Sequence, residues 1–130
     1  MRHDDIEHIG GPVVISGKEL SVTNVVRAGN LLFLSGQIPF TDGVPMIDGT
    51  IEEQTRSCIK HIRNTLAACN CDLSHVVKSM VWLKSREDFP GFDVTYREYF
   101  SSQQPARSAL VSDFLVDVRI EIECIAYLKK

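Results

Sequence analysis

The segment from Asp117 to Cys124 alternates between polar and apolar side chains at every position. Successive side chains of a β-strand point to opposite faces of a sheet, so this pattern predicts a strand that is dry on one face only. The apolar face comprises Val118, Ile120, Ile122 and Cys124, and the polar face comprises Asp117, Arg119, Glu121 and Glu123. The fold must therefore supply a layer that covers the apolar face.

Residues 50–69 predict an amphipathic helix that can form such a layer. Thr50 and Glu53 make the S/T-x-x-E capping box that begins many helices. Behind them, one face is apolar or small at spacings of three and four residues: Ile51, Thr55, Cys58, Ile59, Ile62, Leu66 and Cys69. Asn70 follows, and asparagine tolerates the left-handed conformation with which helices often end.

A second, shorter helix is predicted over residues 88–100. Asp88 suits its N-cap, and Pro90 suits its first turn. Its apolar stripe consists of Phe89, Phe92, Tyr96 and Tyr99 or Phe100. Such a stripe is typical of a helix face that is buried in a core, and we assign it that role.

The other apolar segments predict further strands. They are residues 22–30 and 31–38, joined by a tight turn at Gly29 and Asn30, and then residues 75–84 and 106–115. Residues 41–49 are predicted to form a turn-rich loop between the second strand and the first helix. The predicted order is β-β-α-β-α-β-β, which is an α+β fold with two helices on one face of a mixed sheet. We expect residues 1–130 to form one domain, with residues 1–15 as a mobile leader.

The charge balance argues against a nucleic-acid or membrane partner. The chain has 14 Lys and Arg against 17 Asp and Glu, and no basic run interrupts that balance. A nucleic-acid surface normally needs a basic stripe to neutralise phosphates. No apolar stretch approaches the ~20 residues of a membrane-spanning helix, and the polar, acidic start is unlike a signal peptide. We therefore expect a cytoplasmic protein.

The four cysteines do not predict a metal centre. Cys69 and Cys71 form a C-x-C pair, with His75 four residues further on. Zinc sites usually combine a C-x-x-C spacing with a second pair of ligands, and neither is present. We interpret Cys58, Cys69 and Cys124 as small buried side chains. We expect neither a metal nor another cofactor.

Two of the predicted strands carry apolar residues at consecutive positions. These are the LLFL segment, residues 31–34, and the VVKSMVWL segment, residues 76–83. Consecutive apolar residues place apolar side chains on both faces of a strand, yet two helices can cover only one face of the sheet. A second copy of the chain is the simplest cover for the other face. The sequence therefore predicts an obligate homo-oligomer.

Candidate site residues are few, because the common nucleotide-binding and hydrolase motifs are absent. Ser35 and Gly36 end the most apolar strand, where glycine permits close approach to a ligand; a simple turn is the alternative. Arg107 begins a strand, where it can grip a carboxylate with two hydrogen bonds; a salt bridge is the alternative. Glu121 and Glu123 lie on the polar side of the last strand, and the alternation alone explains them as a solvated face. Together these residues can bind an anion and hold a water without a metal.

The chain resembles the reactive intermediate deaminase family (Rid, also called RidA/YjgF or L-PSP endoribonuclease-like). The resemblance extends from Val22 to Ala126 and is carried by AGNLLFLSGQIP, EEQTRSCIKHIRNTLAAC, VVKSMVWLKSREDFPGFDVTYREYF, PARSAL and RIEIECIA, in this order. It implies a chorismate-mutase-like fold, assembled as a homotrimer with clefts between subunits. It also implies cofactor-independent hydrolysis of enamines and imines, such as 2-aminoacrylate, to 2-keto acids and ammonia.

The resemblance also implies roles for individual residues. Arg107 matches the arginine that binds the substrate carboxylate, and Glu121 matches the glutamate that positions the water. Ser35 and Gly36 match the segment that lines the cleft.

Three positions depart from the family pattern. Val22 lies near the place of a usual tyrosine, Asp93 stands for an asparagine, and Ala109 stands for a cysteine. The anion-binding and water-holding residues are thus kept, while Asp93 and Ala109 change the part of the site that shapes the substrate. Asp93 opposes Arg107 if it faces the cleft.

The first functional hypothesis is therefore a hydrolase that deaminates a small carboxylate-bearing imine or enamine, with a preference shifted from 2-aminoacrylate. The alternative is a non-catalytic trimer of the same fold that binds a metabolite or a partner protein. A ribonuclease is suggested only by one of the family's names, and the acidic balance of the chain argues against it.

Overall fold

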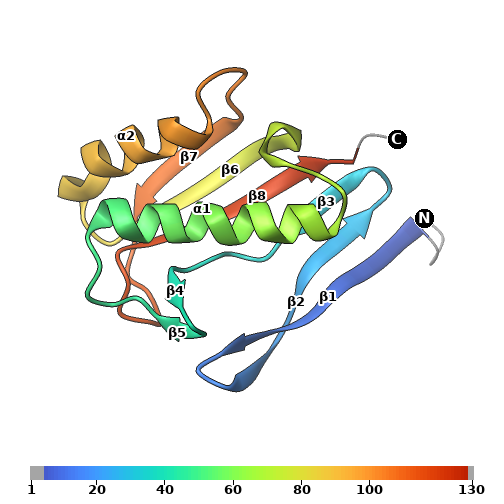
Figure 1. The fold of residues 1–130 in the computed structure, drawn as a ribbon, viewed down its shortest axis with the longest axis horizontal. Helices are drawn as coiled ribbons and strands as arrows, with labels where there is room; N and C mark the ends of the chain where they lie inside the picture. The colour runs from blue at the N-terminus through green and yellow to red at the C-terminus, as the bar shows by residue number, and fades with distance from the viewer. Residues whose placement is uncertain (1–4, 129–130) are drawn as a thin grey trace.

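The computed structural model describes residues 5–128. A sheet lies against two helices (Figure 1). In chain order the elements are β1 (Ile6–Ile15), β2 (Lys18–Ala28), β3 (Leu31–Leu34), β4 (Phe40–Thr41), β5 (Val44–Pro45), α1 (Ile51–Ala68), β6 (Val76–Leu83), α2 (Phe89–Tyr99), β7 (Ala106–Val111) and β8 (Ile120–Tyr127). Short 3₁₀ turns at Leu73–His75 and Arg86–Asp88 precede β6 and α2.

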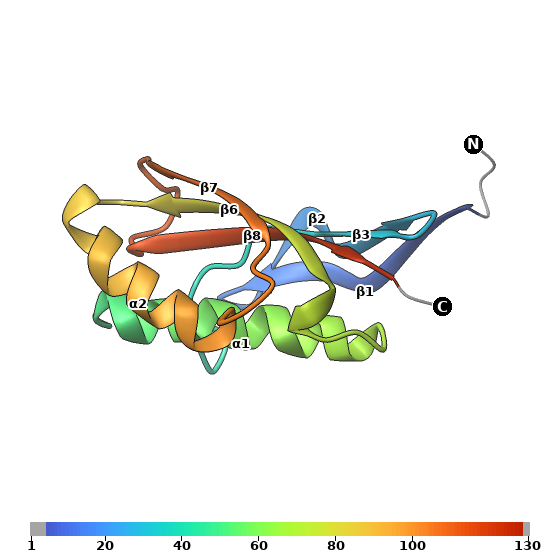
Figure 2. The ribbon, with the colours of Figure 1, turned by 90° about the horizontal axis from the view of Figure 1, so that it is seen from above.

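The six-stranded sheet has the order β1-β2-β3-β8-β6-β7. All neighbouring strands are antiparallel except β6 and β7, which are parallel, so the sheet is mixed as predicted. Figure 2 shows both helices on the same side of the sheet. The α+β prediction with two helices on one face is therefore confirmed. The β8 alternation also holds, because Val118, Ile120, Ile122 and Cys124 are all buried.

Helix α1 begins and ends as its sequence predicts. The Glu53 amide donates to the Thr50 hydroxyl over 3.1 Å, and the Thr50 amide donates to the Glu53 carboxylate over 3.0 Å. Cys69 is the C-cap, and Asn70 follows with a φ of 59°. The buried face contains the predicted residues up to Leu66 and also Gln54, a polar side chain that the pattern did not single out.

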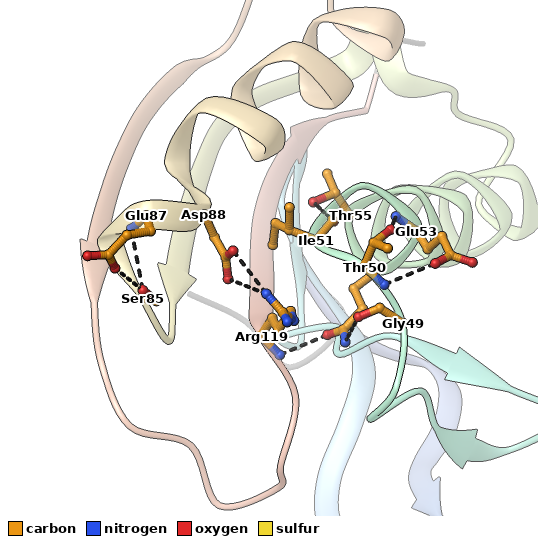
Figure 3. Close-up of polar contacts among 10 residues, drawn as sticks. Gly49, Thr50, Ile51, Glu53, Thr55, Ser85, Glu87, Asp88 and Arg119 are labelled. Carbon is orange, nitrogen blue, oxygen red and sulfur yellow. Dashed lines mark hydrogen bonds and ion pairs between the residues drawn. The ribbon is translucent and has the colours of Figure 1, made fainter.

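Helix α2 has the predicted proline at its start and Asp88 at its N-cap position, but the Asp88 side chain does not cap the helix. The Asp88 side chain makes no capping hydrogen bond. Its carboxylate instead binds the Arg119 guanidinium, with the closest oxygen at 3.1 Å (Figure 3). The Arg119 amide in turn donates to the buried Gln54 side chain over 2.8 Å. These contacts connect the starts of both helices to the chain just before β8.

The prediction that residues 1–15 form a mobile leader is wrong for the part of this segment that the structure describes. Residues 6–15 form β1, which pairs antiparallel with β2. Gly10 and Gly11 have φ values of 84° and 68°, and the register of β1 shifts around them. The Asn24 side-chain amide donates to the Gly10 carbonyl over 3.1 Å, which holds this bulge against β2. The glycine pair interrupts the residue pattern that is typical of a strand, so the sequence pattern did not predict β1.

The predicted loop before α1 contains a small hairpin. Strands β4 and β5 pair across Asp42 and Gly43, which both have positive φ angles. The Ser16 amide, at the β1–β2 turn, donates to the Gly43 carbonyl over 3.2 Å. The β1–β2 turn and this hairpin therefore meet at one side of the molecule (Figure 1).

The sheet face away from the helices, here called the helix-free face, retains exposed apolar side chains. They include Leu20, Val22, Leu31, Phe33, Leu110 and Tyr127. The side chains of Met80 and Trp82 on β6 are only partly buried. One chain therefore leaves uncovered the second apolar face that the sequence predicts.

Candidate functional site

Glu121 lies in a cleft on the helix-free face. The cleft has a volume of 780 Å³, and we call it the Glu121 cleft. Its floor is formed by Ser35, Gly36, Gln37, Trp82, Glu121 and Glu123. Its walls are mostly apolar and come from the β1–β2 hairpin and from residues 112–116. Leu115, on this second wall, is fully exposed.

Gly36 and Glu121 are in close contact within this cleft. A Cβ atom added to Gly36 would overlap the Glu121 carboxylate oxygen Oε2 and would lie 3.0 Å from its carboxyl carbon. Only glycine leaves room for the carboxylate in this position. The sequence prediction was that Gly36 permits the close approach of a ligand; the group that approaches Gly36 within one chain is a glutamate of the same chain.

The segment around Gly36 is fixed by hydrogen bonds on both sides. The Ser35 hydroxyl donates to the Thr23 carbonyl over 2.6 Å, and the Ser35 amide donates to the Asn24 carbonyl over 2.9 Å. Gln37 and Ile122 exchange two backbone hydrogen bonds of 2.8 and 3.0 Å. Ser35 thus lines the cleft with its hydroxyl hydrogen already bonded. Among residues 5–128, no hydrogen bond from the Gly36 amide is present, which leaves this donor for a ligand.

The environment of Glu121 favours its protonated form. Burial raises the pKa of Glu121 above its usual value, and the nearby Glu123 carboxylate raises it further. Trp82 is the cross-strand partner of Glu121 and shares its face of the sheet. A carboxyl group with a raised pKa in an apolar cleft holds a returned proton more readily than an exposed one, so it can both accept and return a proton.

Arg107 lies on the other side of the sheet, beneath α2. Its guanidinium carbon is 4.8 Å from the centre of the Tyr96 ring, 5.1 Å from Phe92 and 5.7 Å from Phe89. These cation–π contacts hold the guanidinium of a residue that lines a 310 Å³ pocket. The pocket, here called the Arg107 pocket, is lined by Asp93, Tyr96, Arg97, Gln104, Pro105 and Arg107.

Asp93 faces Arg107 directly. An Arg107 terminal nitrogen, Nη1, donates to Asp93 Oδ1 over 2.8 Å. Arg97 is a looser partner, with 3.8 Å between its Nη2 and Asp93 Oδ2. Asp93 therefore opposes the charge of Arg107, and the salt bridge that the sequence left open is present. Within the described part of the chain this is the one hydrogen bond that the Arg107 side chain makes, so most of the N–H groups of the guanidinium remain available.

The two central site residues project from opposite faces of the sheet. Arg107 is level with Ser79 on β6, which in turn pairs with the buried Cys124 on the helix side. Glu121 pairs with Trp82, three residues along β6 from Ser79, and therefore points the other way. The Glu121 cleft and the Arg107 pocket share no lining residue. One chain does not bring the two groups together.

Two of the positions that depart from the family pattern lie apart. Val22, on β2, lines the Glu121 cleft and is 48% exposed. A phenol is therefore absent from this wall. Ala109 is an exposed residue of the edge strand β7 and lines neither pocket. Its predicted place in the substrate-binding site is not reproduced within one chain.

The aromatic stripe of α2 has a second role that the sequence analysis missed. Phe92 and Tyr96 are buried as predicted, yet both also contact the Arg107 guanidinium. The Tyr96 hydroxyl donates to the buried Ser79 hydroxyl over 3.0 Å, which fixes its ring. The i, i+4 spacing of two aromatics gave no signal for this role, because a core stripe has the same pattern. Trp82 was likewise assigned only to a strand.

No group of His, Cys, Asp and Glu side chains within residues 5–128 has the arrangement of a metal site. The same part of the chain contains no helix that is long and apolar enough to cross a membrane.

The fold and the two pockets define a class of small α+β proteins in which two helices cover one face of a mixed sheet. The family model for Endoribonuclease L-PSP matches residues 19–128. The chain belongs to this family, which is also known as the YjgF or Rid family.

Among curated proteins, a RutC family protein of Pyrococcus horikoshii is 41% identical over 81% of this chain and 85% of its own length. Reactive Intermediate Deaminase A of Arabidopsis thaliana is 36% identical over 82% of this chain and 58% of its own length. Among solved structures, yeast Mmf1 superposes with a TM-score of 0.85 at 29% identity and covers 95% of this chain and 99% of its own. Relatives of this chain thus include a protein named as a deaminase.

Proposed function

We propose that this protein hydrolyses small carboxylate-bearing imines or enamines to 2-keto acids and ammonia, as a homotrimer and without a cofactor. The observation that carries the proposal is the Glu121 carboxyl group, whose pKa is raised and which lies against Gly36 in an apolar cleft. Such a group is suited to move protons between a water and a substrate. The Gly36 amide is a donor beside it.

The proposal requires a second copy of the chain, because Arg107 and Glu121 point to opposite faces of one sheet. Arg107 belongs to the edge strand β7, where a neighbouring copy can approach it. The helix-free face, which contains the Glu121 cleft, has the exposed apolar side chains that an interface would cover. In a closed ring of three copies, Arg107 of one copy meets the Glu121 cleft of the next.

The chemistry follows from these two groups. Arg107 holds the carboxylate of the substrate. A water oxygen bonds to the imine carbon while Glu121 accepts a water proton, and the nitrogen takes a proton from the solvent to give a carbinolamine. The carbon–nitrogen bond then breaks, Glu121 returns its proton to the nitrogen, and ammonia leaves. The hydroxyl proton is lost and the oxygen becomes that of the keto acid. An enamine first takes a proton on carbon and releases one from nitrogen to become the imine.

We also infer that the preferred substrate differs from 2-aminoacrylate. Val22 leaves the wall of the Glu121 cleft without a phenol. This change favours a larger side chain on the substrate and removes one hydrogen-bonding partner from the cleft.

The direct test generates imino acids in situ from several amino acids with an amino acid oxidase and follows their decay. The wild-type protein is expected to accelerate decay, and Arg107→Ala and Glu121→Gln are each expected to abolish the acceleration. Arg86→Ala, on the 3₁₀ turn before α2, is the matched control and is expected to remain active. Acceleration that persists in Arg107→Ala would rule out this mechanism.

The second candidate function is metabolite binding without turnover. It is favoured by the changes at Val22 and Asp93 around a retained Arg107, because they keep an anion-binding group while they alter the rest of the site. Thermal protection by 2-keto acids, with no acceleration of imine decay for any amino acid, would support this function over the enzyme.

A further inference from the structure

The Asp93–Arg107 pair places an anion and a cation side by side in a small pocket. The two charged groups are 2.8 Å apart, and both side chains are partly exposed, at 32% for Asp93 and 23% for Arg107. An arginine that binds only a carboxylate gains nothing from an aspartate in this position, because the aspartate repels the ligand. The arrangement needs a ligand that also satisfies Asp93.

Among the described residues, the pair has unused hydrogen-bond donors on Arg107 and an unused acceptor oxygen on Asp93. Arg107 uses Nη1 for Asp93 and has further N–H donors that meet no acceptor among the described residues. Asp93 uses Oδ1 for Arg107, while within residues 5–128 its Oδ2 has only the 3.8 Å contact with Arg97, which is longer than a hydrogen bond. The pocket therefore has N–H donors of Arg107 and an acceptor oxygen of Asp93 next to each other.

The surroundings hold both groups in place. Three aromatic rings of α2 pack around the Arg107 guanidinium, and Asp93 comes from the same helix. The rings fix the direction of the cation, and the helix fixes the distance to the anion. A preorganised pair of this kind loses little conformational entropy when it binds a ligand of matching shape.

We propose that the Asp93–Arg107 pair recognises a carboxylate together with a positively charged nitrogen on the neighbouring carbon. Arg107 binds the carboxylate, and Asp93 Oδ2 accepts a hydrogen bond from the nitrogen. An α-amino acid and the protonated form of an α-imino acid both carry this unit, whereas a keto acid or a simple carboxylate lacks the nitrogen. The proposal rests on the function above, and it names the protonated iminium as the form of the substrate that the site selects.

This selection also helps the chemistry. A protonated imine is the more electrophilic form, and an aspartate beside its nitrogen stabilises that charge. The product keto acid has lost the nitrogen and leaves Asp93 unsatisfied, so product release is favoured.

The test uses ligands that do not react. Alanine and propionate share a carbon skeleton and differ in the ammonium group, so their dissociation constants, measured by ligand-observed NMR with the full chain, isolate the contribution of the nitrogen. We expect alanine to bind the wild-type protein about tenfold more tightly than propionate, which corresponds to one charge-assisted hydrogen bond. In Asp93→Asn we expect the preference to be lost or reversed, and in Arg86→Ala, which does not line the Arg107 pocket, we expect it to be retained.

Equal binding of alanine and propionate to the wild-type protein, or no detectable binding of alanine, would overturn the proposal without any variant. An unchanged preference in Asp93→Asn would also overturn it. The imine-decay assay on the same preparation separates this result from the proposed activity. Turnover without the alanine preference removes only the role of Asp93, and the preference without turnover removes only the deaminase.

Discussion

Arg107 and Glu121 belong to the same sheet but project from its opposite faces, because their partners on β6, Ser79 and Trp82, are three residues apart. A substrate that needs both groups must take them from two copies of the chain. Because the two groups are separated in this way, the proposed chemistry requires the proposed assembly. It also makes the assembly testable through activity.

Mixing two inactive variants is expected to restore activity. Arg107→Ala and Glu121→Gln each lack one half of every site. When equal amounts are unfolded and refolded together, random trimers contain some interfaces with an intact Arg107 on one copy and an intact Glu121 on the next. About a quarter of the sites are then complete, so we expect about a quarter of the wild-type rate.

The control for this experiment is the pair of variants refolded separately and mixed afterwards without exchange. That mixture is expected to stay inactive. If co-refolded variants remain as inactive as the separate ones, the two residues do not act across an interface.

Replacement of Gly36 by alanine is expected to impair activity more than stability. The added Cβ occupies the place of the Glu121 carboxylate, and this flexible side chain can move away at a cost of about 1 kcal/mol or less. The displaced carboxylate no longer reaches the water, and loss of such a proton-transfer group costs roughly 10²-fold or more in kcat. Imine-decay kinetics and urea denaturation measure the two effects. A variant with full activity would contradict the assigned position of Glu121.

The dependence of the rate on pH is expected to report the environment of Glu121. The carboxylate form accepts the proton of the water, so kcat should fall as the pH is lowered through the pKa of Glu121, which lies above the usual 4.5. Glu123→Gln removes one cause of the raised pKa and should move this acid limb to lower pH. An acid limb at the same pH in the variant would show that the limb belongs to another group.

Glu121 is also expected to limit stability at neutral pH. Folding raises its pKa, so the folded protein binds this proton more tightly than the unfolded chain does. The resulting stabilisation is fully present below the unfolded pKa and is lost as the pH rises through the folded pKa. Glu121→Gln should therefore melt at a higher temperature than the wild-type protein at neutral pH, and the difference should shrink in acid. A lower melting temperature at neutral pH would contradict this sign.

A charge on the helix-free face is expected to separate the copies. Phe33 lies on this face and is 41% exposed in one chain, so Phe33→Glu should leave the fold of a single copy intact. At an interface, the same glutamate would be buried without a partner and would cost several kcal/mol. Light scattering is expected to show a trimer for the wild-type protein and a monomer for the variant.

Val94→Glu is the matched control for this change, because Val94 is 67% exposed on α2, away from the helix-free face. It should leave the assembly unchanged. A wild-type protein that is monomeric at micromolar concentration would contradict the assembly altogether.

The sequence by itself determined the elements whose signals lie within a few neighbouring residues. The Thr50–Glu53 capping box, the spacing of the buried face of α1 and the alternation of β8 are all local, because helix and strand geometry repeat over two to four residues. The same locality explains the errors. Gly10 and Gly11 interrupt β1 with a bulge, and Asp88 offers the same carboxylate to a helix end or to a distant arginine.

Only the tertiary structure decided what the site residues contact. Arg107 meets an aspartate fourteen positions earlier in the chain, and Glu121 meets a glycine from the end of β3. No local pattern contains such pairs, because they depend on which strands become neighbours and on which face of the sheet each side chain lies. Sequence patterns identified the side chains that are able to do chemistry. The order of the strands, and the face of the sheet to which each side chain points, place Arg107 beside Asp93 and apart from Glu121.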